Sequence, residues 1–240
     1  MIECIFTIDY EIYGNGEGSL AELVHEPARQ LKSIFDHAGA KCVFFVEAAE
    51  LEMIENLNAD PVVQDVKSQL HDLYRQGHEI ALHLHPQWYN ARYESGRWIL
   101  DYGEYNLCLL PEERIIEIVD RSINYLRAVL DDPEYRPVSF RAGNWLFQPT
   151  MPAARVLSER GIKIDSSVFK GGVQRQYGLD YRRASKNGDF WRFREDVNRP
   201  DSRGDILELP IYTKRVPFWK MITGKRLGLQ RQQRKFLLNR

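Results

Sequence analysis

The sequence has few cysteines, no long apolar run and almost no excess charge, and each absence excludes a class of protein. Cys4, Cys42 and Cys108 follow neither a metal-binding spacing nor a disulfide framework. A net charge of -1 at pH 7 gives no overall attraction to nucleic acid or to an anionic membrane. No stretch is long and apolar enough for a membrane helix, and the first predicted strand begins at Ile2, which leaves no room for a signal peptide. We therefore expect a cytoplasmic protein.

The composition is that of an ordinary soluble globular chain. The 240 residues are 43% hydrophobic and 28% charged, which suits one large domain with a sizeable core. The segment 214–240 carries many lysines and arginines and no acidic residue. Such a run is more often a solvated helix face or a tail than a contact surface. We expect one domain over residues 1–213, followed by a basic C-terminal tail or helix over 214–240.

Strand-like and helix-like segments alternate along the chain. The predicted strands are 2–9, 41–47, 78–85, 139–144, 162–168, 190–194 and 206–211, and the predicted helices are 20–38, 61–76, 111–130 and 149–159. The alternation through the first five strands predicts an α/β fold with a mostly parallel sheet, either open or closed into a barrel. Residues 88–109 are rich in aromatic side chains and are expected to form an irregular lid or binding loop.

The strand that ends at Pro86 carries a pair of histidines. His83 and His85 are two residues apart, so on an extended strand both side chains project from the same face. Neutral imidazole is the commonest metal ligand, and two rings that share a direction can bind one ion. The alternative is a pair of hydrogen-bonded histidines at the end of a strand.

Other ionisable residues also fall at the predicted carboxyl ends of strands, where functional residues of parallel α/β folds gather. Asp9 and Glu11 have the same spacing as the histidines and can supply a carboxylate ligand, although they can also be loop-capping acids. Arg141 can hold a carboxylate ionised or form a structural ion pair. Asp165 can support that network or form a local turn. Glu208 lies near the end of the last strand.

Five motifs in this order resemble the polysaccharide deacetylases, the NodB-homology proteins of carbohydrate esterase family four. The motifs are Thr7-Ile-Asp-Tyr-Glu11, Val43-Phe-Phe-Val46, Gly77-His-Glu-Ile-Ala-Leu-His83, Phe140-Arg-Ala-Gly-Asn-Trp145 and Asp165-Ser-Ser-Val168. Each motif is weak alone, but five in order, each at the end of a predicted strand, are fairly specific. The resemblance covers approximately residues 2–212.

The resemblance implies a distorted, seven-stranded (β/α) barrel of the TIM-like kind that binds a divalent metal, usually zinc, through one carboxylate and two histidines. It also implies that Asp9 is the general base for a water bound to this metal, that Arg141 orients Asp9, and that His83 and His85 are ligands. The reaction implied is removal of an acetyl group from an N-acetylated sugar or polysaccharide. A metal that acidifies water beside a carboxylate base is consistent chemistry for that reaction.

The sequence departs from the family pattern in the metal ligands. The usual pair of adjacent aspartates is replaced by Asp9-Tyr10-Glu11, so the carboxylate ligand is either Glu11 or Asp9 itself. The family's second histidine falls on Gln87, and His85 must take its place.

The general acid is the other departure. The late histidine of the family falls on Pro210, and no histidine follows His85. Glu208 or another residue would have to protonate the leaving amine. Two further readings therefore stay open: a non-catalytic relative that binds metal or glycan, and a different carbohydrate hydrolysis that uses Asp9 and Glu208 as a carboxyl pair.

Three residues near the motifs are candidates for substrate binding. Trp88 opens the aromatic segment, and Asn144 and Trp145 follow the arginine motif. Aromatic faces can stack on sugar rings, but the same side chains can also cover an apolar barrel mouth.

Overall fold

In the computed structural model, seven strands form one curved sheet. The structure describes residues 4–12, 16–213 and 216. In spatial order the strands are β1 (Thr7–Tyr10), β2 (Val43–Glu47), β3 (Glu79–Leu84), β6 (Ser139–Ala142), β7 (Ile164–Asp165), β11 (Ile206–Glu208) and β10 (Trp191–Phe193). All neighbours are parallel except β10, which is antiparallel to β11. The mixed α/β class and the mainly parallel sheet are therefore confirmed.

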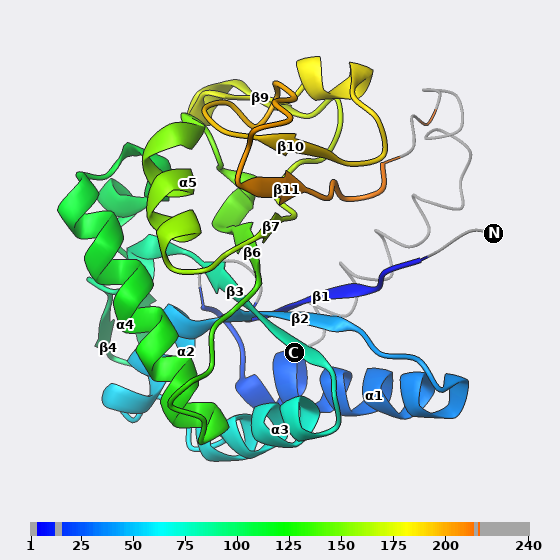
Figure 1. The fold of residues 1–240 in the computed structure, drawn as a ribbon. Coiled ribbons are helices and arrows are strands. Elements are labelled where there is room, and N and C mark those ends of the chain that lie inside the picture. The colour runs from blue at the N-terminus through cyan, green and yellow to red at the C-terminus, as the bar shows by residue number, and fades with distance from the viewer. Residues whose placement is uncertain (1–3, 13–15, 214–215, 217–240) are drawn as a thin grey trace.

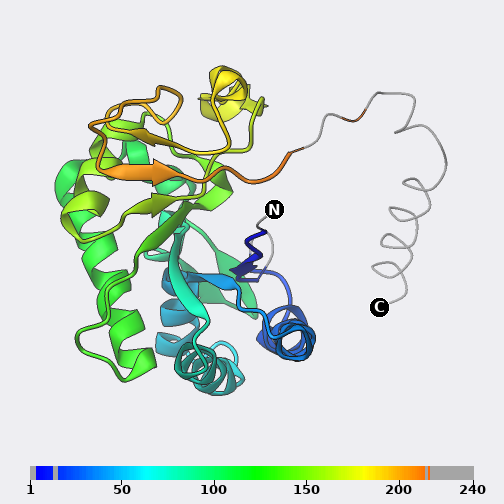
Figure 2. The same cartoon turned by 45° about the vertical axis from the view of Figure 1, so that its right-hand side comes forward.

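The sheet bends as the wall of a barrel does. Figure 1 shows β1, β2 and β3 across the middle of the molecule and β6, β7, β11 and β10 above them, and Figure 2 shows the same sheet after a turn of 45°. Within the described residues, β1 pairs only with β2 and β10 only with β11. Closure of the barrel thus stays a prediction.

Among the described residues, five α-helices are present, and they cover the outside of the sheet (Figure 1). They are α1 (Glu26–Ala38), α2 (Ala48–Asn56), α3 (Val63–Arg75), α4 (Glu112–Leu130) and α5 (Thr150–Glu159). Each has an apolar face that packs inward, for example Val66, Leu70 and Leu73 on α3, which are fully buried. These packed helices leave the inner face of the sheet to the polar residues at the strand ends.

Helix α2 is not among the helices predicted from the sequence, although its alanines, glutamates and leucine favour a helix. It begins directly after β2, without a connecting loop. Glu47 is its N-cap, and the Glu47 carboxylate accepts a hydrogen bond of 3.1 Å from the amide of Ala49. The cap fixes the Glu47 side chain at the end of its strand.

The aromatic segment 88–109 is more regular than expected. It contains a short hairpin, β4 (Arg92–Glu94) and β5 (Arg97–Ile99), so the prediction of a wholly irregular loop is wrong. Ser95 and Gly96 connect the strands, and both have positive φ, as a tight hairpin turn requires.

Two of the segments predicted from the sequence lie at the ends of the chain. Apart from Val216, the predicted basic segment 214–240 lies outside the described residues, and so does the start of the first predicted strand at Ile2. In the part of the chain that is described, no helix combines the length and the apolarity needed to cross a bilayer.

Candidate metal centre and active site

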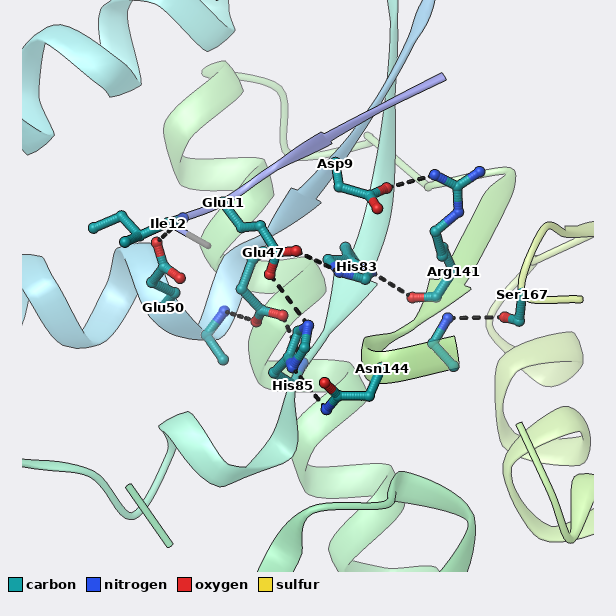
Figure 3. A network of polar contacts seen from close by, with 12 residues as sticks. Asp9, Glu11, Ile12, Glu47, Glu50, His83, His85, Arg141, Asn144 and Ser167 are labelled. Atoms are coloured by element: carbon teal, nitrogen blue, oxygen red, sulfur yellow. Dashed lines mark hydrogen bonds and ion pairs between the residues drawn. The ribbon is translucent and has the colours of Figure 1, made fainter. Parts of the chain in front are cut away.

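Polar side chains from adjacent strands meet on the inner face of the sheet, as Figure 3 shows. The pairing register aligns Glu47 of β2 with His83 of β3, and His83 with Arg141 of β6. Residues aligned across parallel strands point to the same face, so these three side chains form a row. Asp9 and Glu11, at the end of β1, face this row.

Four of these residues form a cluster that could hold a metal ion. Glu11, Glu47, His83 and His85 each offer a ligand atom, and the four atoms lie within 4.8 Å of one another. The Glu11 carboxylate lies between the rings, with Oε1 3.6 Å from Nε2 of His83 and Oε2 3.1 Å from Nε2 of His85. We refer to these four residues as the Glu/His cluster.

The tautomer of His83 suits metal binding. Its Nδ1 lies 2.8 Å from the backbone carbonyl of Arg141, and a carbonyl can only accept a hydrogen bond, so Nδ1 carries a proton. In the neutral ring the lone pair is then on Nε2, which faces Glu11. Metal-binding histidines usually donate their second N–H to such an acceptor.

Two side-chain amides contact the Nδ1 atom of His85. The side-chain amides of Gln87 and Asn144 both lie 3.2 Å from its Nδ1. Gln87 is buried, and its Oε1 has no hydrogen-bond partner among the described residues. Rotating that amide by half a turn places the unpartnered oxygen on Nδ1, which then donates and leaves Nε2 free for a metal.

The ionisation of the carboxylates and imidazoles in the Glu/His cluster favours a bound cation. Burial alone would raise the pKa of Glu11, but His83 and His85 outweigh it and hold that pKa well below its ordinary value. Burial lowers the pKa of His83, yet the Glu11 carboxylate more than compensates and raises it to about 9. Burial also raises the pKa of Glu47 to about 7. A divalent cation in place of the imidazole protons would balance these carboxylates, so the residues fit a metal.

Arg141 holds Asp9 beside the cluster. Its Nη1 donates to Oδ1 of Asp9 at 2.5 Å, and Nη2 donates to the hydroxyls of Thr7 and Ser166 at 3.0 Å each. Its Nε donates to the Ser166 carbonyl at 2.9 Å, and the guanidinium stacks 4.1 Å above the ring of Phe45. The arginine is thus immobilised, while the Asp9 side chain remains 32% exposed.

The structure does not bring Asp165 and Glu208 into this site. Asp165 aligns with Phe140 and with Glu208, which places both carboxyls on the face opposite to Arg141. Both are fully buried, and each carboxyl lies close enough to shift the pKa of the other. Burial raises the pKa of both. Neither has a contact with the Glu/His cluster in the described residues, and Glu208 is therefore poorly placed to protonate a leaving group there.

The residues expected to bind substrate have different surroundings. Trp88 is only 2% exposed and packs edge-on against Trp98, so its ring has little free surface. Trp145 is 40% exposed, with its ring 5.4 Å from that of Phe169. Asn144 contacts His85 and is better described as a support for that ring.

Glu47 is the main residue that sequence reasoning missed. It ends the second predicted strand, so the criterion that selected the other residues, a polar side chain at the carboxyl end of a parallel strand, could have found it. Glu50 was also missed. It is fully buried in α2 and accepts a hydrogen bond of 2.8 Å from the amide of Ile12.

Comparison with known proteins gives a limited likeness of fold. No model of a known protein family matches the sequence, and no curated protein matches it. Among solved structures, this chain aligns with one described as a polysaccharide deacetylase from Mycobacterium smegmatis. The TM-score is 0.46, and the identity is 20% over 82% of this chain and 51% of that chain. The Puue allantoinase aligns with a TM-score of 0.39 and 14% identity over 78% of this chain and 43% of its own. The chain thus spans about half the length of these solved chains or less.

Proposed function

We propose that this chain is a metal-dependent hydrolase that removes an acetyl group from an N-acetylated sugar or polysaccharide. The observation that carries the proposal is the position of the Glu11 carboxylate between the Nε2 atoms of two histidines, with Asp9 beside them on an immobilised arginine. The five motifs that resemble the polysaccharide deacetylases support the choice of substrate class.

In this mechanism Glu11, His83 and His85 would hold the metal. A bound divalent ion would acidify a water molecule and polarise the acetyl carbonyl. Asp9 would take the proton from that water through Oδ2, because Oδ1 is bound to Arg141 and no donor among the described residues contacts Oδ2, and it would return this proton to the amine nitrogen as the C–N bond breaks. The arginine keeps Asp9 in place during the transfer.

A second candidate is a relative that binds metal or glycan without turnover. One observation favours it: the predicted proton donor, Glu208, lies on the other face of the sheet. The same observation disfavours a glycoside hydrolase that would use Asp9 and Glu208 together, since the two carboxyls of such an enzyme flank one bond.

The test is the metal content of the purified protein, with zinc, cobalt and manganese each offered after treatment with a chelator. We expect close to one ion per chain in the wild type and loss of this ion in a His83→Ala/His85→Ala variant. Release of acetate from N-acetylated oligosaccharides should depend on the same ion. Bound metal without any acetate release would favour the second candidate, and no bound metal at all would refute the proposed site.

A further inference from the structure

We propose that Glu47 is a fourth protein ligand, so that the metal is held by two carboxylates and two imidazoles. This inference rests on the metal site proposed above. It goes beyond that site because the resemblance assigns no role to Glu47 and implies only one carboxylate ligand.

The first argument is position. Glu47 is aligned in register with His83 and is fully buried on the same inner face. Its ligand atom belongs to the group that lies within 4.8 Å. Ligands at about 2.1 Å from an ion lie about 3 to 4 Å from each other, so a small contraction around a cation would complete the set.

The second argument is how the carboxylate is held. Oε2 accepts a hydrogen bond of 2.5 Å from the amide of His85, and Oε1 accepts one of 3.1 Å from the amide of Ala49. Each oxygen has a second lone pair, so Glu47 can bind an ion without breaking either bond. Hydrogen-bonded ligand carboxylates are typical of metal sites.

The third argument is charge. The ligand atoms of Glu11 and Glu47 lie within 4.8 Å of each other, and the side chains of Glu47 and Glu50 are fully buried. The nearby cation Arg141 is already bound to Asp9. Buried carboxylates are costly without a cationic partner, and a divalent ion between Glu11 and Glu47 would supply one in place of the imidazole protons.

Four protein ligands have a consequence for the identity of the metal. A four-coordinate zinc site has no position left for a substrate when the protein supplies all four ligands. A hydrolase with this set needs an ion that accepts five or six ligands. Mixed carboxylate and imidazole sites of that kind suit Mn²⁺, Fe²⁺ or Co²⁺.

The experiment compares Glu47→Gln with Glu50→Gln. Both residues are fully buried carboxylates next to or within α2, and both accept backbone N–H groups, but only Glu47 belongs to the cluster. Co²⁺ binding is measured by competition with a chelator, and the visible absorption of bound Co²⁺ reports the number of ligands. For Glu47→Gln we expect affinity to fall by more than about 100-fold, beyond the usual effect of a supporting residue, together with a changed spectrum. Glu50→Gln should keep the wild-type spectrum.

An unchanged spectrum in Glu47→Gln, with an affinity close to that of Glu50→Gln, would overturn the inference and make Glu47 a structural acceptor. If Glu47→Gln does not fold, a crystal structure of the wild type loaded with Co²⁺ decides: a Glu47 oxygen within bonding distance supports the inference, and a clearly longer distance refutes it. A wild type that binds no Co²⁺, Mn²⁺ or Zn²⁺ overturns both this inference and the proposed function. Glu47 bound to Co²⁺ without acetate release supports the inference while the hydrolase proposal fails.

Discussion

The Nδ1 atom of His83 lies 2.8 Å from the carbonyl oxygen of Arg141, and the guanidinium of the same arginine lies 2.5 Å from Asp9. One residue of β6 thus supports a candidate metal ligand through its backbone and the candidate base through its side chain. Substituting the side chain should separate these two roles, because the backbone carbonyl remains.

For Arg141→Lys we expect turnover to fall by about 100-fold or more while metal affinity stays close to that of the wild type. A lysine cannot reproduce the four hydrogen bonds that immobilise the guanidinium, so Asp9 loses its fixed orientation. The measurement is kcat for acetate release together with metal content. Arg160→Lys, which alters an ion pair with Asp120 on the surface, is the control. Equal losses of metal and of activity would contradict the separation of roles.

Asp9→Asn tests the choice between the two carboxylates of the first motif. We expect turnover to fall by about 100-fold to 10,000-fold, because an amide cannot accept the proton. Metal content should remain near one ion per chain, since Glu11, and not Asp9, lies between the histidines. Loss of the metal in this variant would make Asp9 a ligand instead of the base.

The metal-free protein should show a stability that depends on His83. Its pKa is raised from 6.5 to about 9 in the folded state, so the charged ring stabilises the fold fully below pH 6.5 and loses this effect as the pH rises through about 9. We expect denaturant unfolding of the chelator-treated protein to show falling stability over this window. Metal affinity should rise over the same window, because the ion competes with the proton on Nε2. The variant His83→Gln should lack this part of the pH dependence, and an identical pH dependence would refute the assignment.

The sequence predicts the fold class and a group of ionisable residues at the strand ends, because strand ends are recognisable from apolar runs and parallel strands bring their carboxyl ends together. The particular pairing of Arg141 with Asp9 was implied by the family resemblance. The sequence does not predict which face each side chain takes where a strand is short. β7 has two residues, Ile164 and Asp165, and only the observed register shows that Asp165 points away from Arg141. Glu47 ends its predicted strand and could have been selected in the same way as the other residues. What the sequence does not signal is that α2 starts directly after β2, because no turn residue separates the two elements.

Gln87 should support His85 as an acceptor of the Nδ1 proton. We expect Gln87→Leu to weaken metal binding by about 10-fold to 100-fold, the usual effect of removing a group that orients a ligand. Gln87→Glu should bind at least as tightly as the wild type, because a carboxylate is the stronger acceptor at the same position, 3.2 Å from His85. Competition with a chelator measures both affinities. If the leucine variant bound metal as tightly as the wild type, Gln87 would be a packing residue only.

Gly143 brings the loop after β6 against His85, and a side chain there should disturb the site. A Cβ at this position would lie 2.5 Å from the carbonyl oxygen of Leu84 and 2.7 Å from Cγ of His85, and backbone of β3 cannot move away easily. We expect Gly143→Ala to lower the free energy of unfolding by about 1 to 3 kcal/mol and to weaken metal binding, because the ring of His85 must shift. Gly188→Ala, where the nearest atom to the new Cβ is 3.7 Å away, is the matched control and should change neither property. Since both glycines have φ values that alanine can adopt, a difference between the two variants measures the contact with His85 and Leu84 and not the loss of backbone freedom.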